Sequence, residues 1–166
     1  MSHRTVPNSM ELDAIAWKIL ELLQQNARLP FAELGRKVGL STPAVAERVH
    51  RLEEAGILTG YHATVHLGRI GLPIRVVVRL TIPGGDTQLA RAVAAMKEMV
   101  EISRCHRITG AESFIVEANV VSIRHMEALI DRLSALGATS TSTVLSSPVE
   151  RREYRAAQVE ALQRFV

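Results

Sequence analysis

The sequence predicts an α+β protein made of two parts with different rhythms. Apolar residues recur at helical spacing from Leu12 to about Ala55, which predicts three short helices. After Gly60, β-branched runs alternate with helical stretches in the order strand–helix–strand–strand–helix–strand, which is the ferredoxin-like βαββαβ plan. The predicted fold class is therefore an N-terminal winged-type helix-turn-helix domain followed by a ferredoxin-like domain.

The domain boundaries follow from breaks in these patterns. Residues 1–10 have no apolar run and form a tail, and residues 11–66 form the helical domain with a linker strand, YHATVHL. The break LGRIGLP opens the second domain, which spans residues 67–148. Residues 149–166 form a charged C-terminal tail with apolar residues at helical spacing, either a helix docked on a neighbouring element or a frayed end.

The first helix is predicted from Leu12, Ile15, Ile19 and Leu22, which are spaced to share one face. Asn26 marks its end, and a shorter second helix follows.

The second helix ends at Gly39, and the start of the third helix is ambiguous. Ser41 is a good N-cap, whereas Thr42 as the cap would place Pro43 at the favoured first helical position. Gly56 is expected to end the third helix in a left-handed cap.

The second domain is expected to form one sheet with helices on one face. A cap at Asp86 or Thr87 starts its first helix, which runs to Met99, and Ser122 caps a second helix that runs to Leu136. The bare face of such a sheet favours a partner, so we expect a homodimer. The strands are predicted at residues 74–82, 100–108, 114–121 and 139–146.

Composition excludes several classes of protein. The 166 residues are 47% hydrophobic, but no run approaches the ~18 apolar residues of a membrane span. The N-terminus does not resemble a secretory signal, and the single cysteine, Cys105, excludes an internal disulfide. His62 and His66 lack further ligands at metal-binding spacing, so no metal and no cofactor are expected. A cytoplasmic location is the simplest expectation.

The second and third predicted helices, joined by a four-residue turn, match a helix-turn-helix. The third helix begins with small residues that allow close approach to base edges. Glu47 could accept from cytosine, Arg51 could reach guanine or phosphate, and cations of the second helix could hold phosphates. The candidate DNA-binding residues are Arg36, Lys37, Ser41, Thr42, Pro43, Ala44, Glu47, Arg48 and Arg51.

Two observations keep a different interpretation open. Residues 1–68 contain seven basic and seven acidic side chains, so this part is not basic overall. A three-helix unit is also common as a packing or dimerisation module, and Arg48 could simply pair with a carboxylate of the first helix.

A series of short motifs runs between Leu12 and Tyr61, namely LD, IL, NAR, EL, VGLS, RV, RLE and GILTGY. In this order they resemble the DNA-binding half of the Lrp/AsnC (leucine-responsive, feast/famine) family of regulators. In the second half, CHRITGAESFIVEANV resembles the central hairpin of the family's amino-acid-sensing domain, and TSTSTVL resembles its last strand. Together these segments cover about residues 11–147.

The resemblance implies a DNA-binding transcriptional regulator that forms dimers and then octamers or larger discs. It also implies a small effector, usually an amino acid, bound between dimers near the Gly110 turn. The turn departs from the family pattern G..D, because Ser113 stands at the Asp position and Glu112 precedes it. The candidate effector-binding residues are His106, Gly110, Ala111, Glu112, Ser113, Thr141 and Thr143.

Two alternatives to an effector-responsive regulator stay open. One is an architectural DNA-binding protein that responds to no effector. The other is an enzyme, since some tetrapyrrole decarboxylases resemble the same two-domain plan. That chemistry needs a pocket lined by histidine and arginine, for which only His106 and Arg107 are candidates. No acid–base pair, nucleophile triad or phosphate loop is visible, so no enzymatic activity and no catalytic residue is expected.

Overall fold

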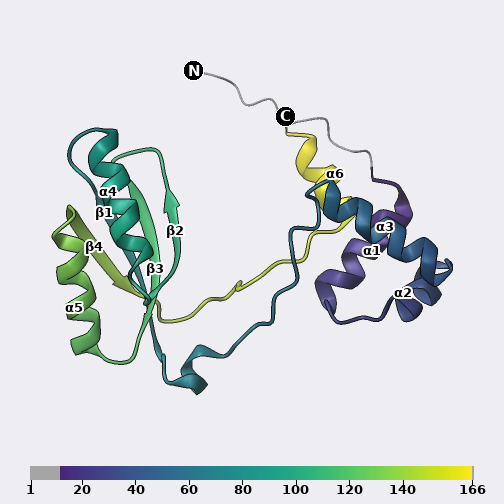
Figure 1. The fold of residues 1–166 in the computed structure, drawn as a ribbon, viewed down its shortest axis with the longest axis horizontal. Helices are drawn as coiled ribbons and strands as arrows, with labels where there is room; N and C mark the ends of the chain where they lie inside the picture. The colour runs from purple at the N-terminus through teal and green to yellow at the C-terminus, as the bar shows by residue number, and fades with distance from the viewer. Residues whose placement is uncertain (1–11, 166) are drawn as a thin grey trace. The chain divides into compact units, whose positions relative to one another are not determined.

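The computed structural model describes residues 12–165, which form two compact units (Figure 1). The first unit contains residues 12–63 together with residues 149–165, and the second unit is Thr64–Pro148. No helix among the described residues is long and apolar enough to span a membrane.

Three helices form the core of the first unit: α1 (Ala14–Gln25), α2 (Phe31–Val38) and α3 (Thr42–Glu54). Each contributes apolar side chains to one buried cluster, because each carries an apolar face at helical spacing. The prediction of three helices is confirmed. Ser41, and not Thr42, is the N-cap of α3, and its hydroxyl accepts a hydrogen bond from the Ala44 amide at 3.4 Å. The most deeply buried members are Ile19, Leu34, Val45, Val49 and Leu52.

Gly56 follows α3 in the left-handed region at φ 65°, as predicted. Tyr61, farther along, donates a hydrogen bond to the Glu53 carboxylate at 2.8 Å. Burial and this bond raise the pKa of Tyr61 to about 12. Residues 61–66 pair with no other strand of the described chain, and Leu67–Ile70 form a 3₁₀ helix. The linker strand predicted here is therefore not formed within the described part of the chain, because a strand needs a hydrogen-bonded neighbour.

The second unit is a four-stranded antiparallel sheet with two helices, in the predicted βαββαβ order. Its strands lie side by side in the order β2-β3-β1-β4, and α4 and α5 contribute to the same core as the sheet. The elements are β1 (Ile74–Thr81), α4 (Asp86–Lys97), β2 (Ile102–Arg107), β3 (Phe114–Val120), α5 (Ile123–Ser134) and β4 (Ala138–Thr143).

Several predicted element ends shift by a few residues. Gly85 is the N-cap of α4, and Asp86 lies in the first turn rather than at the cap. Ser122 caps α5 as predicted, and its hydroxyl accepts from the His125 amide at 3.2 Å. Strand β4 ends at Thr143, earlier than the predicted residue 146, since its pairing with β1 ends there.

The two faces of the sheet differ in polarity. Val76, Val78 and Leu80 of β1 point to the helices and are fully buried. The alternate residues of β1 point to the opposite, open face, where Arg75 donates to Glu117 at 3.0 Å. This open face is the one for which the sequence predicts a partner.

The C-terminal segment belongs to the first unit and contains α6 (Ala156–Gln163). The Gln24 side chain of α1 makes two hydrogen bonds with the Tyr154 backbone: its Nε2 donates to the carbonyl at 2.9 Å, and its Oε1 accepts from the amide at 3.0 Å. The segment is therefore helical over Ala156–Gln163, and its attachment to α1 is made by Tyr154, just before that helix.

Candidate nucleic-acid interface and effector turn

The close packing of α2 against the turn before α3 depends on Gly35. The Leu40 amide donates to the Gly35 carbonyl at 2.9 Å. A Cβ atom at position 35 would lie 2.5 Å from the Leu40 carbonyl oxygen, so only glycine fits here without displacement of the turn. Gly35 therefore sets how closely α2 and α3 approach each other.

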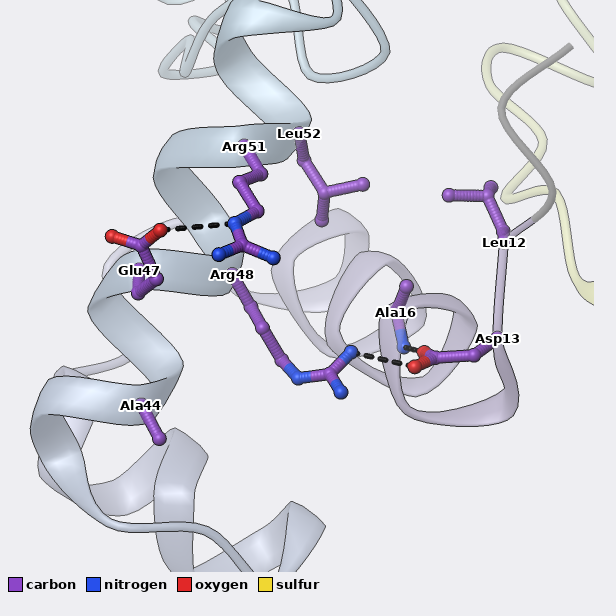
Figure 2. Close-up of a pocket in the computed structure, with 8 residues that line it drawn as sticks. All are labelled: Leu12, Asp13, Ala16, Ala44, Glu47, Arg48, Arg51 and Leu52. Atoms are coloured by element: carbon purple, nitrogen blue, oxygen red, sulfur yellow. Dashed lines mark hydrogen bonds and ion pairs between the residues drawn. The ribbon is translucent and has the colours of Figure 1, made fainter.

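Asp13 connects the start of α1 to the middle of α3 (Figure 2). Its Oδ1 accepts from the Ala16 amide at 2.7 Å, and its Oδ2 accepts from Arg48 Nη1 at 2.7 Å. The Ala16 bond, followed by the Arg48 bond, lowers the pKa of Asp13. Arg48 thus pairs with a carboxylate at the first helix, which was the alternative to its predicted DNA contact.

An open hollow of about 390 Å³ separates the start of α1 from α3 (Figure 2). Ala44, Glu47 and Arg51 of α3 line one side of it, and Asp13 and Ala16 line the other. Four predicted DNA-contacting residues of α3 line this hollow and therefore lie on one side of the unit: Ala44, Glu47, Arg48 and Arg51.

The remaining candidate cations differ in how they are paired. Arg51 bonds Glu47 at 2.9 Å, and Lys37 lies 4.0 Å from Glu33. Both are exposed i,i+4 pairs, worth only ~0.2–0.5 kcal/mol, so a phosphate or base can displace them. Arg36 is exposed and forms no ion pair with any residue in the range 12–165.

Two substitutions at Asp13 distinguish its role as N-cap of α1 from its ion pair with Arg48. An asparagine side chain keeps an N-cap oxygen, so Asp13→Asn should cost at most ~1 kcal/mol, whereas Asp13→Ala should cost ~0.5–2 kcal/mol through the lost cap. Because the folded pKa is lowered, the ionic contribution is present above the unfolded pKa near 3.8 and is lost as pH falls through the folded value. Denaturant unfolding followed by the fluorescence of Trp17, the single tryptophan, measures the first unit. Equal losses for both variants at neutral pH would contradict a role for the cap.

In the second unit, the predicted effector turn lies against the end of β1. Gly110 has φ 120°, and the Ser113 amide donates to the Leu80 carbonyl at 2.9 Å. The Ser113 hydroxyl accepts from the Ile82 amide at 3.0 Å, and the Thr81 hydroxyl donates to the Ala111 carbonyl at 3.4 Å. Ser113 therefore already fixes the turn to the sheet, while Glu112 is half-buried and makes no ion pair with another described residue.

The structure does not bring all the predicted effector residues together within one chain. His106 pairs with Ile115 and lies on the open face, on edge strand β2. Thr141 and Thr143 pair with Val78 and Val76, so they lie on the helix-covered side of the opposite edge strand, β4. Only the 110–113 turn and the end of β1 form a contiguous group.

Known proteins match both units. The AsnC-type helix-turn-helix domain matches residues 12–53, and the Lrp/AsnC ligand binding domain matches residues 75–154. The HTH-type transcriptional regulator LrpC of Bacillus subtilis is 35% identical over 82% of this chain and 94% of its own length. The Leucine-responsive regulatory protein of Haemophilus influenzae is 32% identical over 81% of this chain and 84% of its own length.

Solved structures give the same result. The structure of Bacillus subtilis LrpC matches with a TM-score of 0.80 at 34% identity, over 86% of this chain and all of that chain. A transcriptional regulator from Neisseria meningitidis, in complex with L-Met, matches with a TM-score of 0.81 at 25% identity, over 89% of this chain and 99% of that one. These relatives are named as regulators of transcription or as leucine-responsive regulatory proteins. The chain belongs to the Lrp/AsnC family and is a ligand-responsive, DNA-binding transcriptional regulator.

Proposed function

We propose that this regulator binds double-stranded DNA in the cytoplasm with the N-terminal half of α3 in the major groove and α2 against the phosphates. The observation that carries the proposal is the exposed start of α3, Ser41–Pro43, next to an α2 whose Arg36 forms no ion pair among the described residues. Small side chains at a helix start let the backbone approach base edges, and an unpaired guanidinium is free for a phosphate.

Arg36 and Arg51 are expected to differ in the way their loss weakens DNA binding. Arg36→Ala should weaken binding to all sequences equally and reduce the salt slope by about 1, because it removes one phosphate contact. Arg51→Ala should cost ~1–3 kcal/mol on the operator and much less on other DNA if its guanidinium reads a base. Fluorescence anisotropy over a salt series measures both quantities. If neither variant changes affinity on either DNA, the α2–α3 face is not the interface.

We place the effector at the 110–113 turn and expect an amino acid. The turn is fixed to β1 by Ser113, and Glu112 offers a carboxylate that could receive an ammonium group. The complex of the Neisseria meningitidis regulator with L-Met supports this class of ligand. Because Thr141 and Thr143 lie on a different strand and face from His106, their part in the site requires a second copy of the chain.

The proposed assembly is a homodimer that associates further into an octamer or larger disc. Two features support it: the open face of the sheet carries Val77 and Ile115 among polar residues, and residues 61–66 have no strand partner within the described chain. One DNA-binding domain carries equal numbers of basic and acidic side chains, so it attracts DNA only weakly. Several copies in one assembly bind the same DNA together, which raises the overall affinity.

A footprint on the DNA upstream of the protein's own gene, with and without the twenty amino acids, tests the function. Protection that repeats at about one helical turn and changes with the amino acids supports a regulator that senses one of them. Protection that ignores the amino acids favours the second candidate, an effector-independent architectural role. Glu112→Gln and Ser113→Ala should each alter the response, and an unchanged response in both variants would move the pocket elsewhere.

A further inference from the structure

The first unit has few cations available for DNA. Residues 12–63 contain six basic and six acidic side chains. Four of the six cations form ion pairs, namely Lys18, Lys37, Arg48 and Arg51. Within residues 12–165, Arg28 and Arg36 are the two cations of this stretch that make no ion pair. DNA affinity comes largely from phosphate neutralisation. The three helices offer for it two unpaired cations, together with Lys37 and Arg51, whose weak exposed pairs a phosphate must first displace.

The C-terminal segment supplies the cations that the three helices lack. The five residues RREYR, 151–155, carry three arginines and one glutamate, and all three arginines are exposed. None of the three forms an ion pair with a described residue. The segment thus adds three unpaired cations to the two found within residues 12–63.

The same segment is held on α1 at its centre. The Gln24 amide bonds both the carbonyl and the amide of Tyr154, and Gln25 Nε2 donates to Glu153 at 3.4 Å. The glutamate of the segment is therefore directed to α1, while the arginines on both sides stay free. Half-buried Ala156 and Val159 continue the segment into α6. The two bonds to Tyr154 hold this part of the segment on α1.

Arg28, one of the two unpaired cations of residues 12–63, lies close along the chain to the two glutamines that hold the C-terminal segment. Gln24 and Gln25 form the last turn of α1, and Arg28 follows in the loop that leads to α2. We infer that Arg151, Arg152 and Arg155, held by Gln24, form an accessory phosphate-binding segment that extends the DNA contact beyond α2 and α3. This inference rests on the DNA-binding function and assigns a part of it to the C-terminal tail.

The test measures binding of the full-length protein to a random-sequence DNA duplex over a salt series. Replacement of Arg151, Arg152 and Arg155 by alanine should weaken binding roughly tenfold or more at low salt and reduce the salt slope by about 2 to 3. A control variant removes the same charge from exposed, unpaired positions of the second unit: Arg91, Lys97 and Arg124 to alanine. The control should change the slope by less than one unit, because its cations do not contact phosphate.

A second variant tests whether the arginines must be held on α1, without any change in their charge. Gln24→Leu keeps every arginine but removes the two bonds to Tyr154, so it should reduce the slope by less than the triple variant and more than the control. A triple variant with the control's slope would overturn the inference. A Gln24→Leu protein that unfolds earlier by Trp17 fluorescence but keeps the wild-type slope would overturn the role of Gln24 in holding the arginines for DNA. If wild-type protein itself fails to bind DNA, the DNA-binding function fails first; if it binds and the triple variant matches it, only the tail inference fails.

Discussion

Gly35→Ala is expected to destabilise the first unit by about 2 kcal/mol, although alanine is the better helix former. In an exposed helix interior the same change would stabilise by about 1 kcal/mol. Here the new methyl group would stand 2.5 Å from the Leu40 carbonyl oxygen, closer than any ordinary contact. Overpacking of this kind costs ~1–3 kcal/mol, and relief requires α2 to move away from the turn that leads into α3. DNA binding should fall along with stability, because that movement changes how the two helices are presented.

The measurement is denaturant unfolding followed by Trp17 fluorescence, which reports the first unit. Two glycines serve as controls. At Gly39 nothing lies near the added Cβ, but φ is 73°, so Gly39→Ala should show the cost of backbone strain alone. At Gly85, in the second unit, there is neither a near atom nor a positive φ, so Gly85→Ala should leave the Trp17 transition unchanged. A Gly35→Ala protein as stable as wild type would show that the turn yields easily.

The contrast between Gly35 and Gly56 shows what the sequence can predict. Gly56 is predictable because it follows the last periodic apolar residue of a helix, where a left-handed cap is common. Gly35 lies inside a helix, where local propensity treats glycine only as a weak residue. Glycine is needed at position 35 because the Leu40 carbonyl lies too close for a side chain, and this contact exists only once α2 and α3 are packed.

The order of strands and helices is predictable from the sequence, as the Gly56 cap is, because periodicity is a local property of the chain. The placement of the effector residues was not. A β-bulge between Ile102 and Arg104 shifts the register of β2, so simple alternation along the sequence does not give the face on which His106 lies. The docking of the C-terminal tail on Gln24 also depends on a pairing between residues 130 positions apart, which no spacing reveals.

The second large effect is expected at Glu101, which connects the start of β2 to α5. Its side chain is 8% exposed, and its Oε1 accepts from His125 Nε2 at 2.8 Å and from Arg132. Burial raises the pKa of this carboxyl, but the bonds from His125 and Arg132 outweigh burial, so the pKa is lowered overall. Its Oε2 is buried and has no hydrogen-bond partner among the described residues, so the ionised group depends on Oε1 alone.

Glu101→Gln is therefore expected to destabilise the second unit by about 2 kcal/mol at neutral pH, since hydrogen bonds to charged groups are worth ~1.5–3 kcal/mol. The contribution of Glu101 is present above the unfolded pKa near 4.5 and is lost as pH falls through the lower folded value. The difference between variant and wild type should thus shrink at acid pH, in the unfolding transition seen by circular dichroism and not by Trp17 fluorescence. Glu127→Gln, on the exposed side of α5, is the matched control and should behave as wild type. A deficit of the same size at neutral and acid pH would mean that Glu101 acts through packing and not through its charge.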